Sequence, residues 1–553
     1  MLVIAIALGL VWFLAWAHPL YPPDEGRYGA VADAMAYPLT GAHADWLVPH
    51  FRGQAHLTKP PLTYWLQAAA LLAIGRNELA VRLPGLMATT LTLLCLFGFA
   101  RHVLGTRPAV LAVALAAVMP CVLLVGRLAT TDALLACAWF AALATGYLII
   151  EHRAPRAALS IFWLAIAAAF CIKGPVGFAP LLTLIAWCSI SGRTRALSAL
   201  RMSLGLPLAL LPLGFWIGAV AHQHPEAGGI WWDETFGRVG GAKHLREQPW
   251  WFYLPIFMGG MYPATTMLVL PGFNLRGWLR SARDVWVALS SGDLRALLLI
   301  AVLLPILGFS LSAGKMPTYL LPVAPTTALL VAITLERWLR GEYDKKIEGF
   351  RAPDVRRTFA VVAAVTFLVE IGAALYVRSS HPQLWLIVLA MAITPISAFA
   401  LWAYWERGPK EDWLRNRERG FVFAWAGLVA GWMLLFAVES RATPSMGGDA
   451  VVQQARALLA TPTPVIITVG FTDPTISFYN LGMPTIELEH LSSLDALQAP
   501  NGDAVILMRA SQAYELFARD PEMSARLQPG GSWTKWFARP IQVFVLRGGA
   551  SRS

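Results

Sequence analysis

Apolar runs of about 20 residues alternate with short polar loops over the first 440 residues of the chain. A helix of about 20 apolar residues crosses the hydrocarbon core of a bilayer, so this pattern predicts a helical membrane protein with many spans. Counting every run gives fourteen spans. The run at residues 61–75 is only about fifteen residues long and begins at a proline pair, which favours an interfacial or re-entrant helix.

The basic loops decide between thirteen and fourteen spans. Lys and Arg gather in loops on the inner side of a membrane. Without residues 61–75, the thirteen remaining spans place all the basic loops, from 101–107 to 407–419, on the inside. Counting that segment would put them outside. We therefore expect spans centred near residues 2–18, 79–100, 108–125, 132–150, 158–172, 175–190, 202–221, 251–271, 295–313, 317–336, 358–377, 383–404 and 420–438.

The two ends of the chain differ from this pattern. The first apolar run ends in Ala15-Trp16-Ala17, as a signal peptide does, but no Lys or Arg precedes its apolar core, so we expect an uncleaved first span. After about residue 440, short β-rich runs at 464–469, 504–508 and 542–546 alternate with helical stretches. We expect a transmembrane catalytic domain at 1–440, with long outer loops at 19–78 and 222–250. A small soluble α/β domain follows at 441–553, on the outer side.

Composition supports the membrane assignment. Hydrophobic residues make up 57% of the chain and charged residues 14%, where a soluble protein has about 25% charged residues. The net charge of +11 lies mostly in short loops, so membrane topology explains it better than a nucleic-acid partner does. The five cysteines lie inside apolar runs without metal-type spacing and are expected to be buried hydrophobic residues.

Ionisable residues are concentrated in one polar stretch, residues 18–64. Asp24 and Glu25, followed by Arg27 and Tyr28, form its most enzyme-like feature, and Lys59 lies near its end, before two prolines. Charged groups cannot lie in hydrocarbon without a large cost, so this stretch belongs at the membrane surface or in a watery cavity.

The other outer turns also carry polar motifs. Asp132 lies at the second, Lys173 at the third, and Lys315 and Tyr319 at the fifth; the fourth carries Arg238, Lys243, His244 and Arg246. Such a face suits a substrate with an anionic group at headgroup level. Each residue also has a structural alternative. An acid at the start of a helix interacts favourably with the helix dipole, and Asp24 can form an ion pair with Arg27. The lysines can extend to the membrane interface, and the histidines suit a solvated loop.

The chemistry open to such a face is limited. The sequence has no glycine-rich phosphate loop and no GxSxG motif, which argues against ATP-driven transport and serine hydrolysis. An outward carboxylate can act as a general base, and Lys, Arg and Tyr can hold a leaving lipid phosphate. Because nucleotides are not available outside, an activated sugar would arrive on a lipid.

Several motifs resemble the GT-C superfamily of membrane glycosyltransferases. Within it they are similar to the bacterial branch of lipid A 4-amino-4-deoxy-L-arabinose transferases, related to protein O-mannosyltransferases. The matching stretches run in family order over about residues 1–340 and include PPDEGRYGAVADAM, HLTKPPLTYWL, AVRLPG, GRLATTDALL, IKGPVGFAPLL and SLSAGKMPTYLLPVAP.

The resemblance implies an inverting transfer of a sugar from undecaprenyl phosphate to lipid A phosphate, on the periplasmic face of the bacterial inner membrane. It implies that Asp24 is the leading catalytic residue and that Asp132 is a second carboxylate near the sugar. Residues implied to bind the substrates or line the cavity are Lys59, Tyr319 and Arg246 at the donor phosphate, with Glu25, Arg27, Tyr28, Lys173 and Lys315 around them.

Three questions stay open at this point. No cofactor is predicted, and a divalent metal would need the outer carboxylates to converge, which spacing alone does not show. A protein O-glycosyltransferase of the same superfamily is the first alternative function. A lipid flippase is the second, although transporters often show polar groups at mid-membrane and paired repeats, and neither is evident in this sequence.

Overall fold

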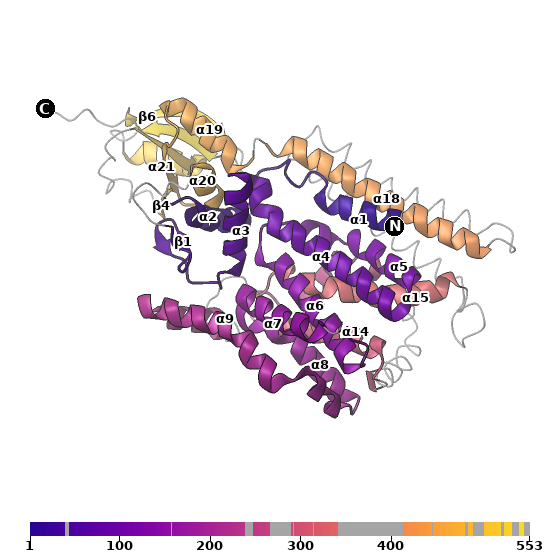
Figure 1. Cartoon of the computed structure of the whole chain (residues 1–553). Coiled ribbons are helices and arrows are strands. Elements are labelled where there is room, and N and C mark those ends of the chain that lie inside the picture. The colour runs from indigo at the N-terminus through magenta and orange to yellow at the C-terminus, as the bar shows by residue number, and fades with distance from the viewer. Residues whose placement is uncertain are drawn as a thin grey trace. The chain divides into compact units, whose positions relative to one another are not determined.

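The computed structural model describes residues 1–38, 44–155, 157–237, 247–265, 289–290, 292–312, 314–340, 413–444, 446–481, 485–489, 503–520, 525–533 and 541–546. The chain divides into two compact units. Unit 1 comprises Met1–Phe13, Leu57–Thr63 and Gly85–Phe436, and unit 2 comprises Leu14–His56, Tyr64–Pro84 and Ala437–Ser553. Figure 1 labels many of the helices and strands of both units.

Unit 1 is built from helices. It holds all or most of α1 (Leu2–Trp12), α4 (Glu78–Leu104), α5 (Thr106–Ala117), α6 (Thr131–Ile150), α7 (Ala158–Lys173), α8 (Ala179–Ile190), α9 (Met202–Gln223), α10 (Ala227–Trp232), α11 (Tyr253–Gly260), α14 (Leu294–Leu311), α15 (Ala324–Leu339) and α18 (Trp413–Ala442). Short 3-10 or π turns join them at Cys121–Val125, Gly174–Phe178, Thr194–Leu200, Asp233–Gly237 and Pro317–Val323.

Seven helical stretches in the described residues are long and apolar enough to cross a bilayer. The chain is therefore a multi-span membrane protein. The stretches are Glu78–Leu104, Thr131–Ile150, Ala158–Ile190, Met202–Gln223, Leu294–Leu311, Pro317–Arg337 and Glu418–Arg441.

The predicted total of thirteen spans is not established. Two predicted spans, 358–377 and 383–404, lie outside the described residues, as does the end of 251–271. The stretch Ala158–Ile190 contains two helices, as predicted, because Gly174 adopts a φ of 65° and ends α7. The segment predicted to be too short for a span is α3 (Leu62–Ile74), a helix of 13 residues.

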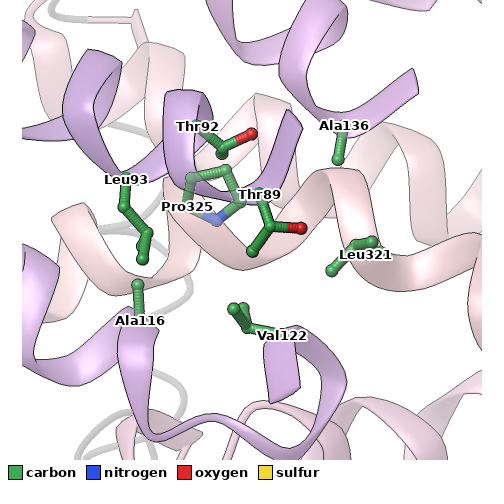
Figure 2. Close-up of a pocket in the computed structure, with 8 residues that line it drawn as sticks. All are labelled: Thr89, Thr92, Leu93, Ala116, Val122, Ala136, Leu321 and Pro325. Atoms are coloured by element: carbon green, nitrogen blue, oxygen red, sulfur yellow. The ribbon is translucent and has the colours of Figure 1, made fainter. Parts of the chain in front are cut away.

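A small cavity lies inside unit 1, between helices α4, α5, α6 and α15 and the turns near them (Figure 2). Of its eight lining residues, Thr89 and Thr92 carry hydroxyl groups. The Thr89 hydroxyl donates to the Gly126 carbonyl at 2.5 Å, and the Thr92 hydroxyl donates to the Ala88 carbonyl at 2.8 Å. The other lining residues are apolar, so the cavity does not suit a sugar or a phosphate.

Unit 2 contains a mixed five-stranded sheet with the strand order β4-β3-β5-β7-β6. β3 pairs in parallel with β4 and β5, whereas β7 pairs antiparallel with β5 and β6. Three of the strands lie where the sequence predicts β-rich runs. The strands are β3 (Val465–Val469), β4 (Ile486–Leu488), β5 (Ala504–Arg509), β6 (Leu527–Trp533) and β7 (Ile541–Leu546), with helices α19 (Gly448–Leu459), α20 (Pro474–Tyr479) and α21 (Ala510–Arg519).

Most of the predicted first outer loop belongs to the same unit as this sheet, whereas its residues Leu57–Thr63 belong to unit 1. It contributes α2 (Asp24–Ala36), the antiparallel pair β1 (His50–Phe51) and β2 (Gln54–Ala55), and most of α3. In Figure 1, α2 lies beside α20, which packs against it. The division predicted at residue 440 stays a prediction; within unit 2, the residues from Ala437 onward group with the first outer loop.

A glycine makes the contact between α2 and α20 close. A Cβ atom on Gly26 would lie 2.5 Å from both the Cγ2 atom and the backbone nitrogen of Thr475. The hairpin joining β1 and β2 adds an ion pair of 2.5 Å between Arg52 and Glu487. The start of α2 is thus held against the C-terminal residues of unit 2.

Gly26→Ala is expected to lower the free energy of unfolding by about 1–3 kcal/mol, because its methyl group would overlap backbone atoms of Thr475. Gly98→Ala in α4 is the matched control, since a Cβ there meets no atom within 4 Å. Thermal unfolding of the purified full chain measures both variants. Equal midpoints for the two variants would contradict the close packing of α2 on α20.

Candidate active site

Asp24 begins helix α2 and lies one turn before Arg27. The Arg27 guanidinium donates to Asp24 Oδ1 at 2.7 Å, and the two side chains remain 32% and 25% exposed. Arg27 also lies 5.7 Å from the ring centre of Tyr28, which stacks on Tyr64 at 5.3 Å. Three predicted site residues therefore meet at the start of one helix. Asp24 and Arg27 are accessible, whereas Tyr28 is buried beneath them.

Glu25 lies in a different environment from its neighbour Asp24. Its side chain is 1% exposed and accepts two hydrogen bonds from Arg82, at 2.9 and 2.7 Å. It also accepts one from the backbone N–H of Tyr21 at 2.9 Å. A buried carboxylate bound in this way is a structural ion pair. We therefore interpret Glu25 as a supporting residue, although the resemblance implies that it lines the cavity.

Arg82 is the residue that the sequence reasoning missed. Its side chain is 1% exposed, and it lies in the stretch AVRLPG, whose pattern alone predicts no role for it. The position of Arg82 does indicate a buried ion pair, because a single arginine near the start of an otherwise apolar span needs a partner.

In unit 1, three further predicted residues meet. Lys173, at the end of α7, lies 2.5 Å from Asp132 Oδ1 in the first turn of α6. The same ammonium lies 4.3 Å from the ring centre of Tyr319, in the turn before α15. The second, third and fifth outer turns thus bring one carboxylate, one cation and one phenol together. Asp132 and Lys173 are only 7% and 12% exposed, so their charges act in a largely desolvated setting.

Lys59 lies next to the fourth outer loop. Its ammonium is 3.8 Å from Glu234, and the Trp231 indole donates to the Leu57 carbonyl at 2.8 Å. These contacts bring the end of the first outer loop against α10 and the turn after it. Lys59 is 20% exposed and therefore remains within reach of an anionic ligand.

Lys315 is held by the fourth outer loop. It is 5% exposed and donates to the Gln248 carbonyl at 2.8 Å, beside a backbone bridge between Glu247 and Gly314. Lys315 therefore joins two outer loops rather than extending to the interface. Arg246, with Arg238, Lys243 and His244, lies outside the described residues.

The described residues include no group of three or more His, Cys, Asp or Glu side chains arranged to hold a metal ion. The chemistry that the described side chains offer is electrostatic. Part-buried cations and a phenol suit a lipid phosphate, and accessible carboxylates suit sugar hydroxyl or amino groups.

Comparisons with known proteins show which proteins this chain is similar to. Residues 58–216 match the model of a family described as dolichyl-phosphate-mannose-protein mannosyltransferase. The undecaprenyl phosphate-alpha-4-amino-4-deoxy-L-arabinose arabinosyl transferase of Edwardsiella ictaluri (strain 93-146) is 29% identical over 394 residues, 69% of this chain and 67% of the relative. The enzyme of the same name from Pseudomonas aeruginosa (strain LESB58) is 28% identical over 443 residues, 78% and 73% of the two chains.

The fold matches a solved structure over almost its whole length. The crystal structure of ArnT from Cupriavidus metallidurans bound to undecaprenyl phosphate superposes with a TM-score of 0.77 at 19% identity, covering 99% of both chains. The chain is a membrane glycosyltransferase with the GT-C fold. The predicted resemblance is thereby confirmed.

The family match divides the glycosyltransferase's candidate residues into two groups. Lys59, Asp132 and Lys173 lie inside the matched segment 58–216. Asp24 and Tyr319 lie outside it. The roles of all five stay predictions.

The buried pair of Glu25 and Arg82 gives a test of its structural role. Glu25→Gln and Arg82→Met are each expected to lower the free energy of unfolding by about 3–5 kcal/mol, because each leaves one buried charge without its partner. The double variant should lose less free energy of unfolding than the sum of the losses in the two single variants. Denaturation of the purified chain measures the three variants.

The matched control is the ion pair of Arg107 and Glu418, whose side chains are 42% and 49% exposed. Breaking it should cost less than about 1 kcal/mol, because solvent screens both charges. Strictly additive losses at Glu25 and Arg82 would show that the two residues are not coupled.

Proposed function

We propose that this glycosyltransferase transfers 4-amino-4-deoxy-L-arabinose from undecaprenyl phosphate to a phosphate group of lipid A. The observation that carries the proposal is similarity over two thirds or more of both chains to transferases whose name gives this donor and this sugar. The match to a fold solved with undecaprenyl phosphate supports the donor class. The acceptor is inferred from the resemblance of the motifs.

The reaction exchanges one phosphate for another at the anomeric carbon. An oxygen of the lipid A phosphate forms a bond to that carbon while the bond from the carbon to undecaprenyl phosphate breaks, with inversion. The acceptor phosphate loses one negative charge and the leaving phosphate gains one. No proton has to be removed overall, so the enzyme's main task is to hold two phosphates and stabilise the charge that moves between them.

The cations of unit 1 suit the leaving phosphate. We assign the donor phosphate to Lys59, Tyr319 and a basic residue of the fourth outer loop, Arg246. Lys173 supports the phosphate site through its contact with the Tyr319 ring and its ion pair with Asp132. Their partial burial lowers the local dielectric and strengthens their attraction to a developing anion.

The carboxylates then have different roles. Asp24 is assigned the leading catalytic role, and because the phosphate nucleophile is already anionic, Asp24 orients the acceptor or balances charge. The amino group of the sugar would share the Asp132 carboxylate with Lys173. Glu25 is not available for this contact, since Arg82 holds it inside the protein.

The proposed location follows from topology. The outer loops and the C-terminal sheet would face the periplasm, and the spans would lie in the bacterial inner membrane. This placement gives the donor lipid a bilayer for its tail and puts the transfer beyond the reach of nucleotides.

A protein O-glycosyltransferase is the second candidate. The family model that matches residues 58–216 is described by transfer of mannose to protein, which favours a protein acceptor. The two candidates share a lipid-linked donor and differ in the nucleophile, so one experiment separates them.

Mass spectrometry of lipid A from cells with and without the intact gene tests the proposal. We expect one added aminopentose per modified phosphate, present only with the gene. Unchanged lipid A together with newly glycosylated periplasmic proteins would instead select the protein acceptor.

Asp24→Asn is expected to reduce this modification by at least about 100-fold, in line with the loss of one preorganised electrostatic group at the reacting centre, while the chain still folds. Glu515→Gln, an exposed carboxylate on α21, is the matched control and should leave the modification unchanged. Near-normal modification by Asp24→Asn would remove Asp24 from the catalytic role.

A further inference from the structure

The segment that leads to Asp24 has no regular secondary structure of its own. Residues 13–23 connect α1 to α2, and three of their carbonyl groups are bound by one side chain. Arg82 donates to the carbonyls of Ala15 at 3.0 Å, His18 at 2.8 Å and Pro19 at 2.9 Å. Arg82 comes from the first turns of α4, more than 60 residues away.

The N–H groups that follow are also bound by side chains. The Leu20 N–H donates to the Tyr479 hydroxyl at 2.8 Å, and the Tyr21 N–H donates to Glu25 Oε2 at 2.9 Å. The Tyr479 hydroxyl in turn donates to Glu78 Oε1 at 3.0 Å. We call Glu25, Glu78, Arg82 and Tyr479 the clamp. Its members come from α2, α4 and α20.

Two of the clamp residues, Glu25 and Arg82, are shielded from water, whereas Glu78 and Tyr479 are partly exposed. Leu20 is fully buried, and Glu25 and Arg82 are 1% exposed. Burial raises the pKa of the Tyr479 hydroxyl far above its usual range, and Glu78 raises it further, so the hydroxyl keeps its proton. It can therefore accept from Leu20 and donate to Glu78 at the same time. Hydrogen bonds at low local dielectric are stronger than in water, so the buried bonds from Arg82 hold the segment most strongly.

The clamp contacts the residues on either side of Asp24 in the sequence. Tyr21 is three residues before Asp24, and Glu25, one of the clamp residues, is the residue after it. Glycines let the C-terminal part of unit 2 approach the backbone closely both before and after Asp24. A Cβ on Gly447 would lie 2.4 Å from Pro19, and one on Gly26 would overlap Thr475. The backbone around Asp24 therefore has little freedom to move.

We propose that Tyr479 is a positioning residue for Asp24, through which the C-terminal part of the chain takes part in the transfer reaction. Its hydroxyl, acting through Leu20 and together with Arg82, sets the place and direction of the first turn of α2. The inference rests on the proposed function only in taking Asp24 as the catalytic carboxylate.

The test compares Tyr479→Phe with Tyr514→Phe in the purified full chain, reconstituted with a lipid-linked aminopentose donor and lipid A. Tyr514 is 79% exposed, so the control removes the same atom from a solvated place. We expect Tyr479→Phe to lower kcat at least fivefold per folded molecule, with the KM for the donor within twofold of the parent. Tyr514→Phe should match the parent in both constants.

A second measurement does not depend on activity. Hydrogen–deuterium exchange of the peptide covering residues 18–30 is expected to become at least tenfold faster in Tyr479→Phe and to stay unchanged in Tyr514→Phe. If the parent chain transfers no aminopentose to lipid A, the proposed function fails, and the exchange rates alone then decide whether the clamp orders this segment.

The inference is overturned if kcat per folded molecule is unchanged in Tyr479→Phe, or if exchange at residues 18–30 is unchanged. If that variant yields little folded protein, a pair at Glu78 answers the same question. Glu78→Gln keeps an acceptor for the Tyr479 hydroxyl and should retain kcat. Glu78→Leu removes that acceptor and should lower kcat. Equal kcat for these two variants would reject the positioning role.

Discussion

The burial of the Arg82 guanidinium is the constraint on which the start of α2 depends. A buried cation costs several kcal/mol unless a carboxylate and hydrogen-bond acceptors surround it. Here one carboxylate and three backbone carbonyls supply five hydrogen bonds. Because those carbonyls belong to the segment before α2, that segment must curve around Arg82. The charge thus determines where Asp24 emerges.

The same requirement explains the polar contacts of unit 1. Asp132 and Lys173 are nearly buried, so each needs the other, and Lys173 also covers the ring of Tyr319. An ion pair of this kind is already desolvated before any substrate arrives. In the proposed reaction, a leaving phosphate would gain charge near Lys173, and this cation would need little further reorganisation to stabilise it. Under the proposed function, groups that are paired for stability would therefore also be prepared for electrostatic catalysis.

Sequence patterns predicted local elements such as helices, and they did not predict contacts between residues that lie far apart in the chain. Hydropathy located α4, α6, α9 and α14, because each is a continuous apolar run. Asp132, Lys173 and Tyr319, which the sequence predicts on one face, lie together in unit 1, and their roles stay predictions. The sequence did not predict that Glu25, unlike its neighbour Asp24, is buried against Arg82, since adjacent acids look alike until their partners are known. The contact of Leu20 with Tyr479 spans 459 residues and leaves no periodic signal.

The hydrogen bond between Leu20 and Tyr479 forms only if the C-terminal part of the chain holds Tyr479 in place. Tyr479 ends α20, a helix of six residues that is too short to be stable alone. Asp473 caps its start by accepting from the Thr475 N–H at 3.0 Å, and Asn480 after it donates to the Pro464 carbonyl at 2.9 Å, next to strand β3. The sheet therefore holds the helix, the helix holds Leu20, and Leu20 lies four residues before Asp24. A fold of this kind connects the segment before Asp24, the proposed catalytic residue, to a sheet that lies more than 400 residues later in the chain.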